Sequence, residues 1–417
     1  MTTTSTAAQS PDTVARAATY ATYVAFTGSG FAFASWASRI PQVRDRLLLD
    51  PSTLGLVLLA VAAGSVLALP LSGPVIARIG SRRTVTAMAL LLGVGLLIAA
   101  GGYLVGLIPL VIGLFLLGFA NGAWDVAMNV QGAVVERRLG RSIMSRFHAG
   151  FSIGTVAGAL VGAALVALRV SVTAHLATVA VLVAIAVPLG ARRFVSDHDG
   201  EPAASAVSPV GADGLACSGD IRTPRGPMAA WGEPRTLLIG LFVLAFAFAE
   251  GVGNDWIIVA VIDGYGATAA VGTLTFAAFL ATMTVGRWFG PGLLDRHGRV
   301  PVVRGLAVLG ILGVLLFVFA PCTPVAFIGA LLWGLGISLG FPVGMSAGAD
   351  DPKLAPGRVS VIASIGYCAF LAGPPLIGFL GDQITVLRAV AAVAVMLAMA
   401  ALVAAVTNPL PSIQDRA

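Results

Sequence analysis

Three polar side chains recur every four residues inside an otherwise apolar part of the sequence. Asn121, Asp125 and Asn129 belong to the stretch GFANGAWDVAMNV, which follows the unbroken apolar run GLIPLVIGLFLL. At helical spacing the three share one stripe of a helix, drifting by about 40° per step. A carboxyl group between two amides can bind and release a proton and accept hydrogen bonds. The alternative is a structural hydrogen bond between two helices. Gly118 and Gly122 present a small surface that would allow such a close helix approach.

A second polar group lies in AFAEGVGNDWIIVAV, where Glu250 and Asn254 share a helix face and Asp255 and Trp256 follow. The glycines of this stretch lower helix propensity and predict local unwinding next to a cavity. We expect Glu250 about 21 Å into its helix and therefore in the outer half of it. It is either a site residue or a cap that faces water near the outer surface. Asp255 is expected nearer to the outer loop.

The remaining candidates have a structural alternative each. Trp36 is expected to anchor the membrane interface, and Arg39 is expected to pair with an outer acid, Asp255 or Asp263. His148 either relays protons or is solvated at the inner interface. Three aromatic residues of the later apolar runs either stack on a sugar ring or pack the core: Trp333, Phe341 and Tyr367.

Composition decides what surrounds these residues. The chain has 417 residues, 58% hydrophobic and 11% charged, with a mean hydropathy of +0.94. A soluble globular protein has about 25% charged residues, so this chain cannot cover itself with polar surface. The composition therefore excludes a soluble protein and indicates one that lies in a membrane.

The apolar runs are long enough to cross a bilayer as helices. A span needs about 20 apolar residues, because the hydrocarbon core is about 30 Å thick. The strands of a membrane barrel would instead alternate over about ten residues. The sequence predicts an all-α polytopic membrane protein. Its twelve predicted spans are 18–37, 53–76, 84–103, 106–132, 148–168, 172–190, 236–259, 268–288, 301–320, 324–346, 359–380 and 385–406.

Basic residues predict the orientation. With the N-terminus in the cytoplasm, the inner segments hold nineteen of the 25 Lys and Arg residues and the outer ones five, while Arg287 lies near the inner end of span eight. Basic residues concentrate in cytoplasmic loops, so both termini are expected there, in a cell membrane. Contact of these loops with anionic lipid headgroups accounts for the net charge of +6, so no nucleic acid partner is implied.

The longest hydrophilic stretch divides the chain into halves. Residues 191–235 are rich in Pro, Gly, Ala and Ser and show no apolar period, as expected of a flexible linker. The predicted organisation has a cytoplasmic tail at 1–17, a six-helix bundle at 18–190, this linker, a second six-helix bundle at 236–406 and a second tail at 407–417. The N-terminal residues show no signal peptide. The cysteines and histidines show no metal or disulfide spacing, so no metal or cofactor is expected.

The two halves repeat one loop sequence, GPVIARIGSRR after span two and PGLLDRHGRV after span eight. Aligning the R-x-G that both loops share, Arg78 with Arg296 and Gly80 with Gly298, places equivalent residues 218 positions apart. Weak internal symmetry of this kind is typical of transporters built from repeats. The first copy contributes Gly73, Arg78, Gly80, Arg82 and Arg83, and the second contributes Asp295, Arg296, Gly298 and Arg299.

Both loops resemble the loop G-x-x-x-D-R-x-G-R-R of the major facilitator superfamily. The first copy has Ala77 where the family has its acid, and the second has Pro291 at the leading Gly position. GFANGAWDVAMN, together with Glu136 further on, resembles the fourth span of the fucose permease-like branch, as do WASRIPQV and GFP. The loss of the acid at Ala77 puts in doubt the charge relay by which the family holds its outward-open state, and leaves Asp295 to carry it.

The resemblance implies a rocker-switch secondary transporter with a central cavity, functional as a monomer. The leading hypothesis is proton-coupled symport of a small polar solute, with a sugar suggested by the branch, and the residues discussed above as substrate and coupling site. Efflux of drugs or metabolites by proton antiport is the alternative. A membrane enzyme or sensor is disfavoured, because the sequence has no P-loop, HExxH or Ser–His–Asp pattern.

Overall fold

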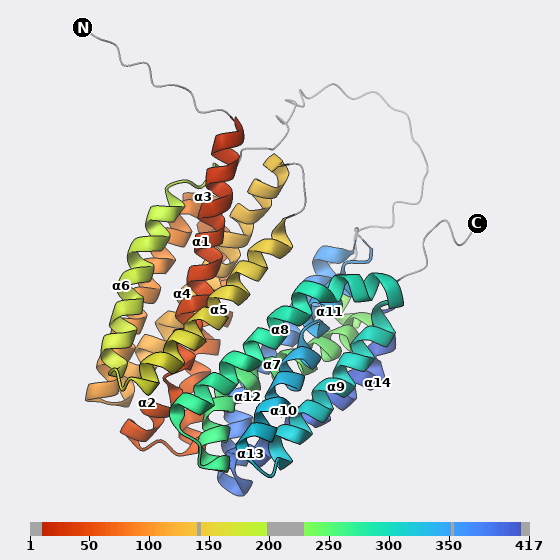
Figure 1. The fold of residues 1–417 in the computed structure, drawn as a ribbon. Coiled ribbons are helices and arrows are strands. Elements are labelled where there is room, and N and C mark those ends of the chain that lie inside the picture. Colours follow the sequence, from red (N-terminus) through yellow and green to blue (C-terminus); the bar gives the residue numbers. More distant parts are fainter. Residues whose placement is uncertain (1–10, 140–142, 198–228, 352–353, 410–417) are drawn as a thin grey trace, which may run out of the picture.

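The computed structural model describes residues 11–139, 143–197, 229–351 and 354–409. Its regular elements are all helical and form two bundles, one from each half of the sequence (Figure 1). The N-terminal bundle runs from red to yellow-green in the figure and the C-terminal bundle from green to blue.

The N-terminal bundle contains six elements. Its bounds are α1 Pro11–Ala37, α2 Ile40–Leu47, α3 Pro51–Val105, α4 Leu107–Leu139, α5 Met144–Ala167 and α6 Val172–Ala191. The predicted spans two and three are both in α3, on either side of a kink at Gly80, where the backbone leaves the helical conformation. The side chain of Asp50 caps α3 by accepting a hydrogen bond from the Thr53 amide at 2.7 Å, so α3 begins where its first amides find an acceptor.

The C-terminal bundle is built in the same way but with more interruptions. Its elements are η1 Ala229–Gly232, α7 Pro234–Tyr265, α8 Ala269–His297, α9 Arg299–Phe319, α10 Thr323–Ile337, α11 Gly340–Gly348, α12 Ala355–Ile384, α13 Val386–Ala389, α14 Ala392–Val403 and η2 Ala404–Thr407. The predicted span ten is divided between α10 and α11 by a turn at Ser338 and Leu339. The predicted span twelve is divided between α13 and α14.

Ten helical segments of the described chain are long and apolar enough to cross a membrane. One of them, Pro51–Val105, holds two predicted spans. Helix α1, which is rich in small and hydroxyl-bearing residues, is not among the ten and occupies the place of the first predicted span. The helices thus account for all twelve predicted spans in a 6+6 arrangement.

Two glycines adopt the same rare backbone conformation in the two repeated loops. Gly80 has φ 81° and ψ 159°, and Gly298 has φ 78° and ψ 166°. Side chains strongly disfavour positive φ, so glycine is what both turns require. The alignment of the two loops predicted from their shared R-x-G is therefore reproduced in the backbone.

The contact between the two bundles is not the same at their two ends. We call the end where α6 finishes and α7 begins the linker end, and the opposite end, where α2 and α13 lie, the far end (Figure 1). At the far end α3 and α12 touch through their backbones. A Cβ atom on Gly55 would lie 2.5 Å from the Pro374 carbonyl oxygen, and one on Gly378 would lie 2.4 Å from that of Pro51.

Two predicted boundaries differ from the structure. Helix α1 begins at Pro11, inside the predicted tail 1–17, because proline at the first helical position is preorganised for a helix start. Helix α7 extends to Tyr265, beyond the predicted end at 259. Most of the predicted linker, 198–228, and the tail from 410 onwards lie outside the described residues.

Candidate functional site

In the polar stripe of α4, Asn121 and Asn129 make structural hydrogen bonds, whereas Asp125 has a carboxylate without a described cation partner. Asn121 accepts a hydrogen bond from the Ser29 hydroxyl of α1 at 2.8 Å and so joins two helices. The Asn129 side-chain amide donates to the Asp125 carbonyl at 2.8 Å and to its carboxylate at 3.3 Å. Asp125 is partly exposed, and no described cation lies within ion-pair distance of it.

Asp125 lies within electrostatic range of the other bundle, because Tyr367 of α12 interacts with it across the bundle boundary. Helix α4 packs closely on α3, where a Cβ atom on Gly118 would lie 1.9 Å from the Val61 carbonyl oxygen. The predicted close helix approach at Gly118 is confirmed, and Gly118 lies two helical turns before Asp125, on nearly the same side of α4.

The acid of the C-terminal bundle has a cation partner. The Arg287 guanidinium on α8 donates to the Glu250 carboxylate at 2.7 Å and to the Ser338 carbonyl at 3.3 Å. The turn between α10 and α11 frees that carbonyl from helical pairing. Glu250 lies at the middle of α7, 16 residues after Pro234 and 15 before Tyr265, because α7 is longer than the predicted span. Its place in the outer half of the membrane stays a prediction.

His148 of α5 completes this group from the opposite bundle. It interacts electrostatically with Arg287 and packs edge-on against Phe26, with ring centroids 5.2 Å apart. Helices α5 and α8 pack together where the bundles meet. His148 was expected at the inner interface and Arg287 near the inner end of its span. The pairing of Arg287 with Glu250 could not be predicted from the sequence, because the two residues are 37 positions apart on different helices.

The other candidates on α7 differ in surroundings. Asn254 is partly buried with its carbonyl oxygen unpartnered, Asp255 is partly exposed, and Trp256 is fully buried. The predicted unwinding at the α7 glycines is wrong, because the helix is continuous. Gly253 instead leaves room for the Phe279 ring, which a Cβ atom there would meet at 2.5 Å.

Arg39 does not pair with either predicted acid. Its side chain is 2% exposed, and its Nε donates to His175 Nδ1 on α6 at 2.8 Å. The prediction is wrong because the turn before α2 directs Arg39 into its own bundle. Trp36 is buried rather than placed as an interfacial anchor.

Arg44, which lies on α2 five residues after Arg39, pairs with Asp263 of α7 instead. The hydroxyl of Ser52 donates to Asp382 of α12. Both contacts join the two bundles through their side chains, and both lie at the far end.

The first repeated loop holds an acid that the sequence did not predict. Gly73, Arg78, Arg82 and Arg83 are exposed, and Gly80 forms the turn. After that turn, the Ser81 amide donates to the Asp197 carboxylate at 2.6 Å, and the Ser81 hydroxyl also donates to it. Asp197 lies just beyond α6 and places negative charge at a helix start, where it is favourable.

The second repeated loop is held by arginines instead. Arg299 donates to Asp350 at 2.7 Å, and Arg235 donates to the other oxygen of Asp350 at 2.9 Å. Asp295 and Arg296 are exposed. Asp350 is therefore the acid that this loop engages in the present conformation.

Aromatic residues and a groove complete the description of the candidates. Trp333 is fully buried between Phe279 and Phe317, so it packs the core.

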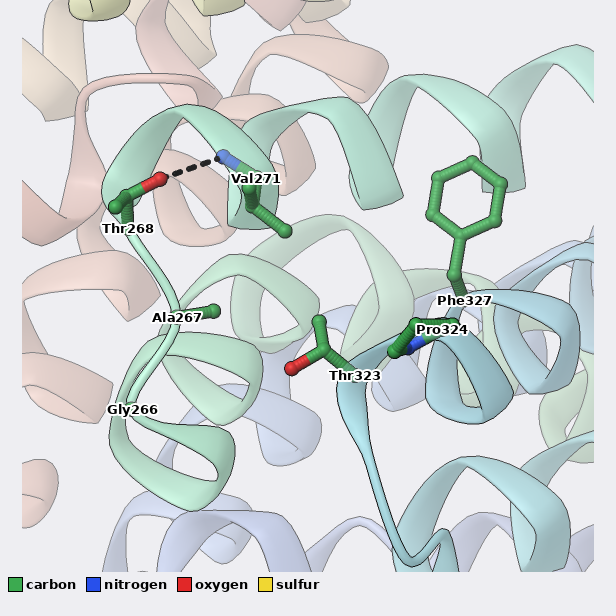
Figure 2. A pocket seen from close by; sticks show the side chains of 7 residues that line it. All are labelled: Gly266, Ala267, Thr268, Val271, Thr323, Pro324 and Phe327. Carbon is green, nitrogen blue, oxygen red and sulfur yellow. Dashed lines mark hydrogen bonds between the residues drawn. The ribbon is translucent and has the colours of Figure 1, made fainter.

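The groove of 610 Å³ in Figure 2 lies between the α7–α8 connection and the start of α10, lined by residues such as Thr268, Thr323 and Phe327. It holds no charged side chain and is separate from the site. No cluster of three or more metal-binding side chains occurs in the described part of the chain.

Comparison with known proteins supports this reading of the architecture. An uncharacterised MFS-type transporter of Yersinia pestis is 31% identical over 381 residues, covering 90% of this chain and 92% of the relative. The membrane protein MosC of Rhizobium meliloti is 28% identical over 367 residues, which cover 87% of this chain and 83% of MosC.

Solved transporters share the fold. A bacterial homologue of the lysosomal transporter Spinster superposes with a TM-score of 0.74 at 11% identity, covering 97% of this chain and all of that one. A nucleoside transporter, NupG, gives 0.72 at 14% identity, covering 94% and 98%. The fucose:proton symporter FucP in its outward conformation gives 0.59 at 16% identity, covering 93% and 100%.

The family model of the Major Facilitator Superfamily matches residues 19–355, which include the α4 stripe, both repeated loops and the Glu250–Arg287 pair. Its members are secondary transporters rather than enzymes. The chain is a multi-pass membrane protein that belongs to the Major Facilitator Superfamily.

Proposed function

We propose that this transporter moves a small polar solute across the cell membrane by proton-coupled symport, with Asp125 as the group that takes up and releases the proton. The observation that carries the proposal is the isolation of Asp125, which has an amide neighbour but no cation among the described residues. A carboxylate in the membrane is costly, by about 2.5–3.5 kcal/mol on insertion scales, unless it is paired or wetted. Glu250 avoids this cost by pairing with Arg287, and Asp125 avoids it by taking up a proton when no water reaches it.

The proposed conformation is open to the cytoplasm. The excess of basic residues in the loops at the linker end favours an orientation with this end inside the cell. The far end, where Arg44 meets Asp263 and α3 meets α12, is then the closed outer side. In support, the TM-score is 0.74 with a structure described as inward-facing and 0.59 with one described as outward. Alternating access would open the far end and close the linker end.

The solute is expected to be hydroxyl-rich and without net charge. Asp125 and Asn129 offer an acceptor and a donor from one bundle, and Tyr367 offers a hydroxyl from the other. The charge of Arg287 is balanced by Glu250, which leaves no free cation in this group to hold an anion. Sugars satisfy this description, and two structural neighbours are named for a nucleoside and for fucose, which both contain a sugar.

Uptake into proteoliposomes under an imposed pH gradient tests the proposal. A panel of sugars, polyols and nucleosides is first screened for thermal stabilisation of the purified protein. Asp125→Asn should then lose accumulation driven by the gradient while keeping solute exchange, because solute exchange needs no net proton transfer.

Asp50→Asn is the matched control. It also neutralises one acid, but asparagine preserves the cap of α3, so accumulation should be unchanged. Full accumulation by Asp125→Asn would remove Asp125 from the coupling role. Accumulation only under the opposite gradient would replace symport by antiport efflux.

A further inference from the structure

A groove runs between α1 and α6 on the N-terminal bundle, away from the site described above. It has a volume of 450 Å³ and is lined mainly by apolar side chains, among them Val24, Phe31 and Leu182, with Tyr20 at the end nearest to the linker end. From Tyr20 to Phe31 the groove follows α1 for about 16 Å, which is about half of the hydrocarbon thickness of a bilayer. Its length therefore matches one leaflet.

Three arginines lie where the groove meets the linker end. Arg16 is four residues before Tyr20 and continues the same stripe of α1. Arg192 and Arg193 follow the last turn of α6. A Cβ atom on Gly190 would lie 3.2 Å from the Val24 side chain, so the end of α6 is level with the start of the groove.

Among the described residues, these arginines have no partner that would account for their position. All three are exposed, and none forms a hydrogen bond or ion pair through its side chain with a described residue. Arg192 and Arg193 are favourably placed against the dipole of α6, but that effect does not involve Arg16 on another helix. Arginine at a membrane surface attracts anionic lipid, and its guanidinium binds phosphate through two parallel hydrogen bonds.

We propose that the α1–α6 groove binds one anionic phospholipid from the leaflet at the linker end. Its acyl chain lies along Val24 and Phe31, and its phosphate is held by Arg16, Arg192 and Arg193. The apolar groove alone would accept any lipid tail. The arginine cluster gives the site its preference for negative charge.

Lipid titration of the purified, delipidated full chain tests the site, with native mass spectrometry as the readout. The probes are phosphatidylglycerol and phosphatidylcholine with identical acyl chains. The wild type should bind phosphatidylglycerol more tightly, and this preference should fall as salt is raised, because the contact is electrostatic. The double variant R16Q/R193Q should lose about fivefold in phosphatidylglycerol affinity for each arginine removed.

The control variant R137Q/R146Q removes two other exposed arginines from the same end of the bundle. It should keep the phosphatidylglycerol affinity within about twofold, since it is outside the groove. The variant Ala186→Phe fills the groove without a charge change and should weaken both lipids. An equal loss in the control, or displacement of the lipid by glycerol phosphate alone, would overturn the proposal in favour of general surface charge or a free-phosphate site.

Discussion

Asp125 of the N-terminal bundle and Glu250 of the C-terminal bundle both lie near the middle of a long helix, and the two acids have different partners. Glu250 on α7 accepts a hydrogen bond from Arg287 at 2.7 Å, and the same arginine reaches the broken helix at Ser338. Among the described residues, the Asp125 carboxylate on α4 accepts a hydrogen bond only from the Asn129 amide, at 3.3 Å. An ion pair fixes the charge of both members, whereas an isolated acid can change its charge. The comparison separates an acid that ties helices together from one that is available for coupling.

Breaking the paired acid should have the largest effect. Glu250→Gln or Arg287→Gln leaves one uncompensated charge in the membrane, which we expect to cost about 2 kcal/mol, the low end for a buried pair because both side chains are partly exposed. Thermal unfolding in detergent measures the loss. The double variant E250Q/R287Q should recover a large part of it, since no unpaired charge remains.

If the losses in stability of the two single variants simply add in the double variant, the pairing is contradicted. Transport by the same variants is a second readout, because His148 of the other bundle interacts with Arg287. If the pair is structural, the single variants should lose stability and transport together.

Giving Asp125 a cation should make the N-terminal bundle resemble the C-terminal one. Asn129→Lys places a lysine four residues after the acid, the favourable orientation for an ion pair on a helix. We expect at least about tenfold slower proton-driven accumulation, since a free-energy difference of about 1.4 kcal/mol that holds Asp125 ionised is enough for that factor. Asn129→Met, with similar reach and no charge, is the control and should retain a pH-dependent rate.

Neutralising Asp125 should change stability in the direction opposite to Glu250→Gln. Asp125→Asn removes a carboxylate that has no cation partner among the described residues, so the unfolding temperature should stay the same or rise, by the equivalent of about 1 kcal/mol or less. The same thermal assay measures it. A large destabilisation would show that Asp125 is a structural residue, and the contrast between the two bundles would disappear.

The smallest expected effect concerns a third acid, Asp50, which lies outside the membrane. The hydrogen bond from the Thr53 amide lowers the pKa of Asp50. A lowered pKa in the folded state stabilises the fold above the unfolded value of about 3.9 and loses this contribution as the pH falls through the folded value. Between pH about 5 and 3, the unfolding temperature of the wild type should therefore fall slightly more than that of Asp50→Asn. Identical pH profiles would mean that this cap contributes nothing.

The sequence predicted the architecture because long apolar runs and basic loops are local signals. The R-x-G shared by the two loops was sufficient to align Gly80 with Gly298, and the two backbones agree. The number of spans and the membrane location followed from hydropathy alone.

Pairings between distant residues could not be predicted in this way. Arg39 and Arg44 are only five residues apart, and the turn before α2 decides which one reaches the other bundle. Asp197 follows α6 yet accepts hydrogen bonds from Ser81 in the middle of α3, 116 residues earlier. Such contacts depend on tertiary packing that no local pattern encodes.

The meeting of α3 and α12 at the far end has a consequence for how the carrier moves. Glycine there brings main chain against main chain, so dispersion between closely packed atoms adds to the Arg44–Asp263 ion pair and the Ser52–Asp382 hydrogen bond. The dispersion attraction falls by a quarter to a half when a gap of only about 0.5–1 Å appears. Once the ion pair and the hydrogen bond have broken, a slight separation of α3 from α12 therefore removes part of what resists further separation, and we expect this end to open in one step instead of widening gradually.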